Sequence, residues 1–278
     1  MLRLENLPVS PATQIALTEL QAAVDAGATF AERVELAKAW WKRKASRGAY
    51  EAAFNEIKVL LSRMAYGSVR CAYCEDSAAD EIEHIAPKTV LPSLAFAWIN
   101  YCYACGPCNG PKSNRHAVVD DDGTLTEIDQ TTLTDQPAEA MALIDPRGED
   151  YKDFLEIDIG GVTPAGEQLP TTSRFRIREG LSAKDKARAK WTIEVLRLNR
   201  EVVRKARESA LIAYRASLRD YALDKAAGVP QAHLETLRVG ILEMPHPSVL
   251  NELIRQVATQ PKVRMAIQAA PEIATWLR

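Results

Sequence analysis

The sequence predicts an α+β fold that is mostly α-helical, and two observations lead to this prediction. Apolar residues recur every three or four positions between residues 11 and 65, and again from residue 182 onward; this is the period of an amphipathic helix. The segment between these two periodic regions is richer in Pro, Gly, Cys and β-branched residues, and this composition favours short strands and loops. We therefore divide the chain into a helical region (1–66), a cysteine-containing core (67–150), and short strands followed by a second helical region (151–278).

Three helices are predicted near the N-terminus, over residues 13–24, 30–44 and 49–64, separated by Gly27 and Gly48. In the middle of the chain, AVVDDDGTLTEID predicts a hairpin that turns at Asp122-Gly123. The alternating segments FLEIDIGGVTP and SRFRIREG predict further strands. The segment 129–140 is predicted to be an irregular connection.

The C-terminal part predicts three or four helices. Ser182 is a plausible N-cap, with Asp185 three residues later. Breaks are expected at Gly228-Val-Pro230 and at Met244-Pro-His-Pro247. One apolar face is expected from the three- and four-residue spacing of Trp191, Val195, Leu198 and Val202.

The composition is that of an ordinary globular protein. The chain has 278 residues, of which 47% are hydrophobic and 26% charged, so a disordered or fibrous chain is excluded. A net charge of −2 excludes a strongly basic protein that coats DNA. There is no apolar run of about 20 residues to span a membrane, and no secretory signal is evident. We expect a cytoplasmic protein without a membrane partner.

All five cysteines lie between residues 71 and 108. In a reducing compartment, such a cluster points to metal binding instead of disulfides. Four of the five form the pairs Cys71-Ala-Tyr-Cys74 and Cys105-Gly-Pro-Cys108, with 30 residues between the pairs. This spacing predicts a closed, structural Zn²⁺ site. Cys102 is left over and is predicted to be a small buried apolar residue.

The residues between and around the two cysteine pairs read EIEHIAPK, then Phe96-Ala-Trp98-Ile-Asn100, then CGPCNGPKSNRH. This pattern resembles the HNH endonuclease family, which implies a ββα-metal core flanked here by N- and C-terminal helical regions. Together with Ile144-Asp-Pro-Arg147 and the segment 192–199, it is similar to the PtuB-like nucleases of the Septu and retron anti-phage systems. The similarity covers roughly residues 67–208.

The resemblance implies a role for five residues. His84 matches the general base, and Glu83 and Asn109 match the protein ligands of a catalytic Mg²⁺ or Mn²⁺. Asn100 matches the Asn that orders the loop, and Lys112 matches the lysine three residues after the last Asn. The chain departs from the commoner pattern in having Glu where Asp is usual and Asn where the last His is usual.

These residue types suit phosphodiester hydrolysis. An imidazole can take a proton from water near neutral pH, and does so best when a hydrogen bond to its other nitrogen fixes the tautomer; the Asn100 side chain or a backbone carbonyl can supply that bond. Carboxylate and amide oxygens suit Mg²⁺. Because adjacent strand residues point to opposite faces, a bulge or bend is expected near Glu83-His84.

Nucleic-acid contacts are predicted from local basic residues. Segment 184–208 holds nine bases against four acids, and Arg197, Arg200, Arg204 and Arg207 recur at helical spacing; a salt-bridged surface is the alternative. A second basic segment, 36–50, surrounds Trp40 and Trp41, and its alternative is a solvated helix with tryptophans in the core. The predicted nucleic-acid-binding residues are Lys112, Arg115, His116, Arg197, Arg200 and Arg204; for His116 a solvated surface histidine is the alternative.

The function expected from the sequence is metal-dependent cleavage of DNA, or of RNA, by the nuclease effector of a bacterial anti-phage complex. The resemblance implies an ATPase partner encoded alongside, and the chain itself has no GxxxxGK[ST] motif. The alternative is a zinc-stabilised nucleic-acid-binding or adaptor module without catalytic activity.

Overall fold

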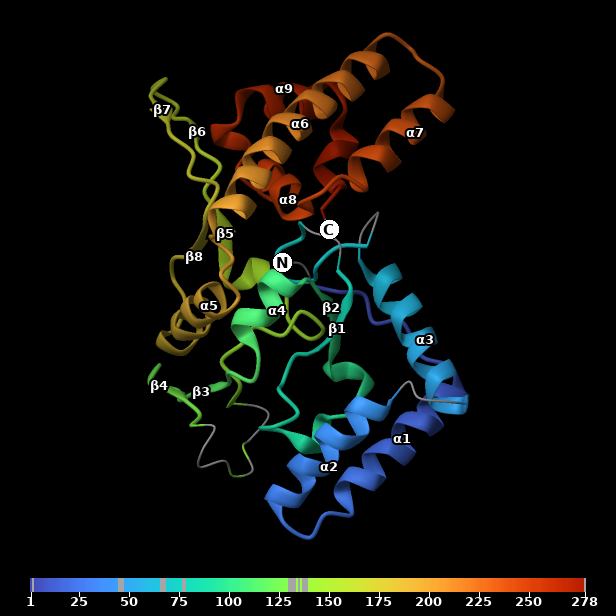
Figure 1. The fold of residues 1–278 in the computed structure, drawn as a ribbon. Coiled ribbons are helices and arrows are strands. Elements are labelled where there is room, and N and C mark those ends of the chain that lie inside the picture. The colour runs from blue at the N-terminus through green and yellow to red at the C-terminus, as the bar shows by residue number, and fades with distance from the viewer. Residues whose placement is uncertain are drawn as a thin grey trace.

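The computed structural model describes residues 1, 3–44, 48–65, 69–76, 79–129, 134, 136 and 140–277. The three N-terminal helices lie at one end of the molecule (Figure 1); they are α1 (Pro11–Asp25), α2 (Phe30–Arg43) and α3 (Gly48–Met64). Their bounds confirm the helices predicted from the apolar period. The Ser10 side chain accepts a hydrogen bond from the Thr13 amide at the start of α1, and Thr29 forms a capping box with Glu32 at the start of α2.

The centre of the molecule is a two-stranded antiparallel sheet followed by a short helix: β1 (Glu81–His84), β2 (Tyr101–Ala104) and α4 (Gly106–Lys112). Pairing runs without interruption from Glu81 opposite Ala104 to His84 opposite Tyr101. The predicted bulge at Glu83-His84 is therefore wrong. A regular pleat sends the Glu83 and His84 side chains to opposite faces of the strand, and this decides which groups each of them meets.

The remaining strands form three small antiparallel pairs. The hairpin predicted at Asp122-Gly123 is confirmed, and Gly123 supplies the positive φ of 87° that its turn requires. The other predicted strands are also confirmed, while segment 129–140 lies largely outside the described residues. The pairs are β3 (Ala117–Val119) with β4 (Leu125–Glu127), β5 (Leu155–Ile157) with β8 (Phe175–Ile177), and β6 (Gly161–Val162) with β7 (Gln168–Leu169).

Five α-helices follow Ser182 in the described chain, more than the three or four predicted: α5 (Ala183–Val195), α6 (Glu201–Ala226), α7 (Gln231–Leu242), α8 (Pro247–Arg255) and α9 (Pro261–Ala269). Ser182 caps α5 as predicted, by accepting from the Asp185 amide. Arg197 adopts a left-handed φ of 48° between α5 and α6, so the predicted continuous apolar face breaks there. Val202 is consequently 63% exposed, although Leu198 is fully buried.

One hydrophobic core connects all these parts. In it α1 packs on α2 and α3, and α6 packs on α7, α8 and α9; the sheet of β1 and β2 lies between these two groups of helices (Figure 1). Short 3₁₀ helices complete the described chain: Pro92–Leu94, Trp98–Asn100, Tyr151–Asp153, Val257–Thr259 and Pro271–Thr275. None of the described helices is long and apolar enough to span a bilayer.

Candidate active site and metal centre

Four cysteines form a buried cluster at the start of α4. The Sγ atoms of Cys71, Cys74, Cys105 and Cys108 all lie within 4.8 Å of one another, and those of Cys74 and Cys105 are 3.8 Å apart. A tetrahedral Zn²⁺ with Zn–S bonds of about 2.3 Å places its sulfurs about 3.8 Å apart. The cluster can therefore hold a zinc ion, as the cysteine spacing predicts. Cys102 is fully buried outside it, and burial raises its pKa to about 12, so it remains a thiol.

Arg200 lies against this cluster. Its Nη1 is 3.3 Å from the Cys108 Sγ, and its Nη2 is 3.9 Å from the Cys105 Sγ. A guanidinium at this distance compensates the negative charge of metal-bound thiolates. The structure thus directs Arg200 toward the cysteine cluster, whereas the sequence predicted that it contacts a nucleic acid.

Two further arginines of the predicted row, Arg204 and Arg207, also turn inward. Arg204 is half-buried and donates to the Thr172 carbonyl at 3.5 Å. Arg207 is 1% exposed and donates to the Leu198 carbonyl at 2.9 Å. Arg197 alone of the four is exposed. Because α6 begins only after Arg197, the row does not form one outward face, and the prediction of such a surface is wrong.

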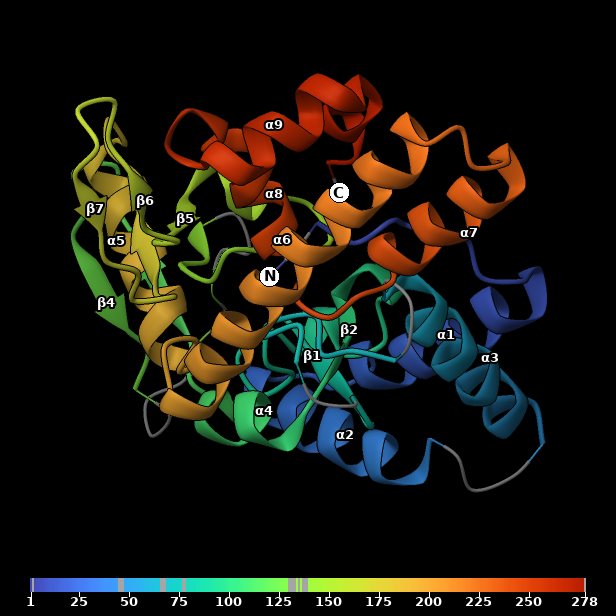
Figure 2. The same cartoon turned by 90° about the horizontal axis from the view of Figure 1, so that it is seen from above.

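A cleft of about 300 Å³ lies over β1, between α2 and α4; Figure 2 shows both helices close to the strands. Helix α2 contributes Trp41, the loop after β1 contributes Lys88, and α4 contributes Asn109. The cleft brings together three of the residues predicted to be catalytic, together with two that were not. Its polar lining residues include Glu81, Glu83, His84, Lys88 and Asn109.

The His84 side chain is 96% buried at the wall of the cleft, against the Trp41 ring, with ring centroids 4.1 Å apart. Its Nε2 is 2.8 Å from the Ala95 carbonyl oxygen. A carbonyl only accepts, so Nε2 carries the proton and Nδ1 keeps a lone pair. Burial, followed by the charge of Lys88, lowers the pKa of His84 to about 3. The ring is therefore neutral at pH 7 and its Nδ1 can accept a proton.

Glu83 points away from His84, toward α4. The Lys112 Nζ is 2.5 Å from the Glu83 Oε1 and 2.8 Å from the His84 carbonyl oxygen. Lys112 is 1% exposed, so it does not reach a nucleic acid at the surface, contrary to the prediction. Burial raises the pKa of Glu83, although the Lys112 charge opposes that rise. The carboxylate predicted to bind the catalytic metal thus has a buried lysine as its partner.

Glu81 is an acidic cleft residue that was not predicted from the sequence, as Lys88 also was not. The Glu81 Oε2 accepts a hydrogen bond from the Nδ2 of Asn109, so the partner of Asn109 is Glu81 and not Glu83. Glu81 and Glu83 are two residues apart on one strand and share a face. The alternation in EIEH was the signal that pointed to it. Together the Glu81 carboxylate and the Asn109 amide oxygen are donors that suit a hard divalent cation.

Asn100 holds the loop between β1 and β2. Its Oδ1 accepts from the Ala86 amide at 2.7 Å, while its Nδ2 donates to the Ala86 carbonyl at 3.0 Å and to the Leu94 carbonyl at 2.9 Å. The loop-ordering role predicted for Asn100 agrees with these contacts. The hydrogen bond of the His84 ring goes to the Ala95 carbonyl oxygen, next to Leu94 in the same loop, and not to the Asn100 side chain.

Arg115 and His116 lie beside the β3–β4 hairpin. Arg115 is exposed, forms an ion pair with Glu127 at 2.7 Å, and lies 4.8 Å from the centroid of the Trp191 ring. His116 is 3% exposed, and its Nε2 is buried without a hydrogen-bond partner. Burial lowers its pKa to about 4. Both sequence interpretations of His116, a phosphate contact and a solvated surface residue, are therefore wrong.

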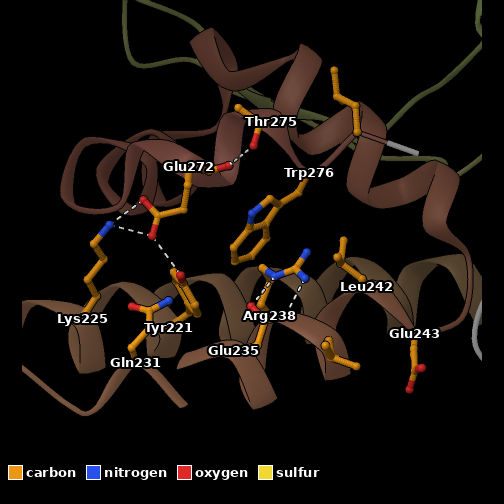
Figure 3. Close-up of a pocket in the computed structure, with 12 residues that line it drawn as sticks. Tyr221, Lys225, Gln231, Glu235, Arg238, Leu242, Glu243, Glu272, Thr275 and Trp276 are labelled. Carbon is orange, nitrogen blue, oxygen red and sulfur yellow. Dashed lines mark hydrogen bonds and ion pairs between the residues drawn. The ribbon is translucent and has the colours of Figure 1, made fainter. Parts of the chain in front are cut away.

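A larger cavity of about 860 Å³ lies among α6, α7 and the last 3₁₀ helix (Figure 3). Its cations are already paired: Lys225 contacts both carboxylate oxygens of Glu272 at 2.6 and 2.5 Å, and Arg238 contacts Glu235 at 2.6 Å. The walls include Trp276 and the exposed carboxylate of Glu243, but no histidine, cysteine or lysine without a partner lines the cavity in the part of the chain described. This cavity therefore does not have the chemistry of an active site.

The β1 cleft combines a neutral buried histidine with nearby oxygen donors, and the cysteine cluster lies at the beginning of the helix that carries Asn109. The function has to be inferred from this geometry. In comparisons with known proteins, no family model, no curated protein and no solved structure matches the chain.

Proposed function

We propose that this chain is a metal-dependent endonuclease of the HNH type that hydrolyses phosphodiester bonds, with DNA as the substrate. The observation that carries the proposal is the tautomer of His84. Because Nε2–H donates to the Ala95 carbonyl, the basic Nδ1 is left at the wall of a cleft that also holds Glu81 and Asn109. A general base beside a site for a divalent cation is the requirement for hydrolysis of a phosphodiester.

The residues of the cleft have separable roles in this proposal. His84 takes the proton of the attacking water at Nδ1. The Glu81 carboxylate and the Asn109 amide oxygen would hold Mg²⁺ or Mn²⁺, with Glu83 as a further oxygen donor if its ion pair with Lys112 opened. Such a cation would supply positive charge where negative charge builds on the phosphate. Asn100 keeps the loop that carries the Ala95 carbonyl in place, and so keeps the His84 tautomer.

The arrangement of elements supports the resemblance to the HNH family. Two antiparallel strands are followed by a helix, with the histidine on the first strand and Asn109 on the helix. The proposed zinc in the cysteine cluster is structural, because four thiolates complete a tetrahedral shell and leave no open position. It ties the segment before β1 to the start of α4 and so positions Asn109 relative to His84.

We also propose that the nuclease acts in the cytoplasm as the effector of an anti-phage complex with an ATPase subunit. This part of the proposal rests on the PtuB-like pattern over residues 67–208. The absence of a GxxxxGK[ST] motif in the chain agrees with a separate nucleotide-binding partner. Co-purification with the products of neighbouring genes tests it.

The experiment that tests cleavage compares wild type with His84→Ala on plasmid DNA with Mg²⁺ or Mn²⁺. Removal of a general base is expected to slow cleavage by about 10²- to 10⁴-fold while zinc content stays unchanged. His233→Ala is the matched control, because the His233 ring is 53% exposed and far along the chain, beside Asp224. Cleavage by His84→Ala at the wild-type rate would contradict the assignment of His84.

A zinc-stabilised nucleic-acid-binding or adaptor module is the second candidate, and one observation favours it. The ion pair of Lys112 with Glu83 neutralises a carboxylate that a working metal site would use, as expected of an inactive remnant. Such a module would show no metal-dependent nicking, and its binding to DNA or to a partner protein would be the same in wild type and in His84→Ala.

A further inference from the structure

Three lysines surround the Trp41 side of the β1 cleft. The Lys44 Nζ is 4.1 Å from the centroid of the Trp41 ring and donates to the Trp41 carbonyl at 3.3 Å. The Lys88 Nζ is 5.7 Å from the same centroid. Burial, followed by the charges of Lys88 and then Lys58, lowers the pKa of Lys44. The Lys44 ammonium group is therefore close enough to be repelled by those of Lys88 and Lys58.

None of these three lysines forms a direct ion pair with an acidic side chain in the described part of the chain, although the charge of Glu83 acts on Lys88. Other lysines of the same region do form such a pair: Lys38 pairs with Glu35 at 2.7 Å, and Lys112 with Glu83. Like charges held together without a counter-charge are unfavourable in the free protein. An anion bound among them removes that repulsion, so the cluster is suited to an anionic ligand.

The lysines lie along a groove longer than the cleft. A second cavity of about 390 Å³, lined by Lys44 and Lys58, shares Trp41, Glu81 and Asn109 with the cleft that contains His84 and Lys88. The two cavities together form one groove along β1, which we call the lysine groove. An extended polyanion in it would pass both His84 and the three lysines. A single small anion would use only part of it.

We propose that the lysine groove binds the phosphodiester backbone of the nucleic-acid strand next to the bond that is cut. This inference rests on the proposed nuclease function and replaces the surface predicted on α5 and α6. The Trp41 ring packs against His84 and is covered by Lys44, so it is not free to stack on a base. Binding in the groove is therefore electrostatic and independent of base sequence.

Three acidic residues, Asp80, Glu81 and Glu83, also line the groove, and Glu83 is paired with Lys112. Their charges repel phosphates when no cation is present. A divalent cation near Glu81 reverses that effect. The groove is therefore expected to hold nucleic acid more tightly with Ca²⁺ than with a chelator.

The test measures binding apart from cleavage, in protein that carries His84→Ala. The probe is a fluorescent single-stranded DNA of about 16 nucleotides, titrated by anisotropy at several KCl concentrations in Ca²⁺. The test variant changes Lys44, Lys58 and Lys88 to Gln. The control variant changes three exposed bases on and after α5, Lys186, Lys190 and Arg197, to Gln, and so removes equal charge from the surface that the sequence pattern favoured.

Loss of three phosphate contacts should reduce the slope of log K against log salt by about 2 for a single strand, whereas the control should keep the wild-type slope. Zinc content and the melting temperature check that both variants fold. Equal slopes for the test variant and the parent, or an equal drop in both variants, would overturn the inference. If the slope falls in the test variant but the wild-type protein does not cleave DNA, the binding role of the groove is supported and the nuclease proposal is contradicted. If the wild-type protein cleaves DNA but the slopes are unchanged, the nuclease proposal is supported and the binding role of the groove is contradicted.

Discussion

Replacement of Arg200 by Gln is expected to weaken zinc binding by the cysteine cluster. Four thiolates around Zn²⁺ carry a net charge of about −2, and the Arg200 Nη1 is 3.3 Å from the Cys108 Sγ. Two unit charges 3.3 Å apart interact by about 5 kcal/mol at an effective dielectric constant of about 20. The guanidinium is half-buried and loses hydration, which reduces the net gain to about 2 kcal/mol, within the range of a charged hydrogen bond.

A loss of about 2 kcal/mol corresponds to an approximately 30-fold weaker affinity, within the roughly 10- to 100-fold range for groups that contact metal ligands. A competition titration with a coloured zinc chelator measures it. Arg204→Gln is the matched control, because its guanidinium meets the Thr172 carbonyl and no sulfur. A zinc affinity of Arg200→Gln within about twofold of that of Arg204→Gln would refute the reasoning, since the charge contact would then contribute almost nothing.

Four further predictions follow from the same contacts. Cys71→Ser should lose its zinc and melt at a lower temperature, whereas Cys102→Ser should keep its zinc, because Cys71 belongs to the four-cysteine cluster and Cys102 does not. Elemental analysis measures the zinc content of both variants. Glu81→Gln should weaken Mn²⁺ binding in calorimetry about tenfold more than Glu83→Gln, since Glu83 is already paired with Lys112; equal losses would contradict this. Asn100→Ala leaves buried backbone groups without partners and should lower the free energy of unfolding by about 3 kcal/mol in urea. The pKa of His116 is about 4 in the folded protein and 6.5 in the unfolded chain, so unfolding takes up a proton between these pH values. The free energy of unfolding is therefore undiminished by His116 above pH 6.5, and about 2 kcal/mol of it is lost by pH 5. His116→Leu should show a correspondingly smaller fall in unfolding free energy between pH 7 and pH 5, and an unchanged fall would count against burial of a neutral ring.

The parts of this protein that were predictable from sequence are those set by neighbours along the chain. The helices α1 to α3 follow from an apolar period, and the hairpin at Asp122-Gly123 follows from a turn that needs a positive φ. The two CxxC pairs likewise predicted the cysteine cluster, because each pair brings two thiolates together within one turn of chain. In all three cases the physical cause lies within a few residues.

A local sequence pattern does not decide which of two groups obtains a partner for which both compete. Glu83 was predicted to bind the metal from its place beside His84, but uninterrupted pairing in β1 turns Glu83 toward Lys112 and places Glu81 beside Asn109. Which carboxylate meets which cation depends on the register of β1 against β2 and on the position of α4. No local pattern contains that information.

The residue types therefore determined what chemistry the chain can carry: four thiolates for zinc, a histidine that can act as a base, and oxygen donors near it. Only the tertiary structure decided which copies of these groups meet. It placed the Ala95 carbonyl on His84, turned Arg200 toward the cysteines, and gathered Lys44 and Lys88 around Trp41. The physical reason is that charge pairing and burial act over a few ångströms in space between residues that are far apart along the chain.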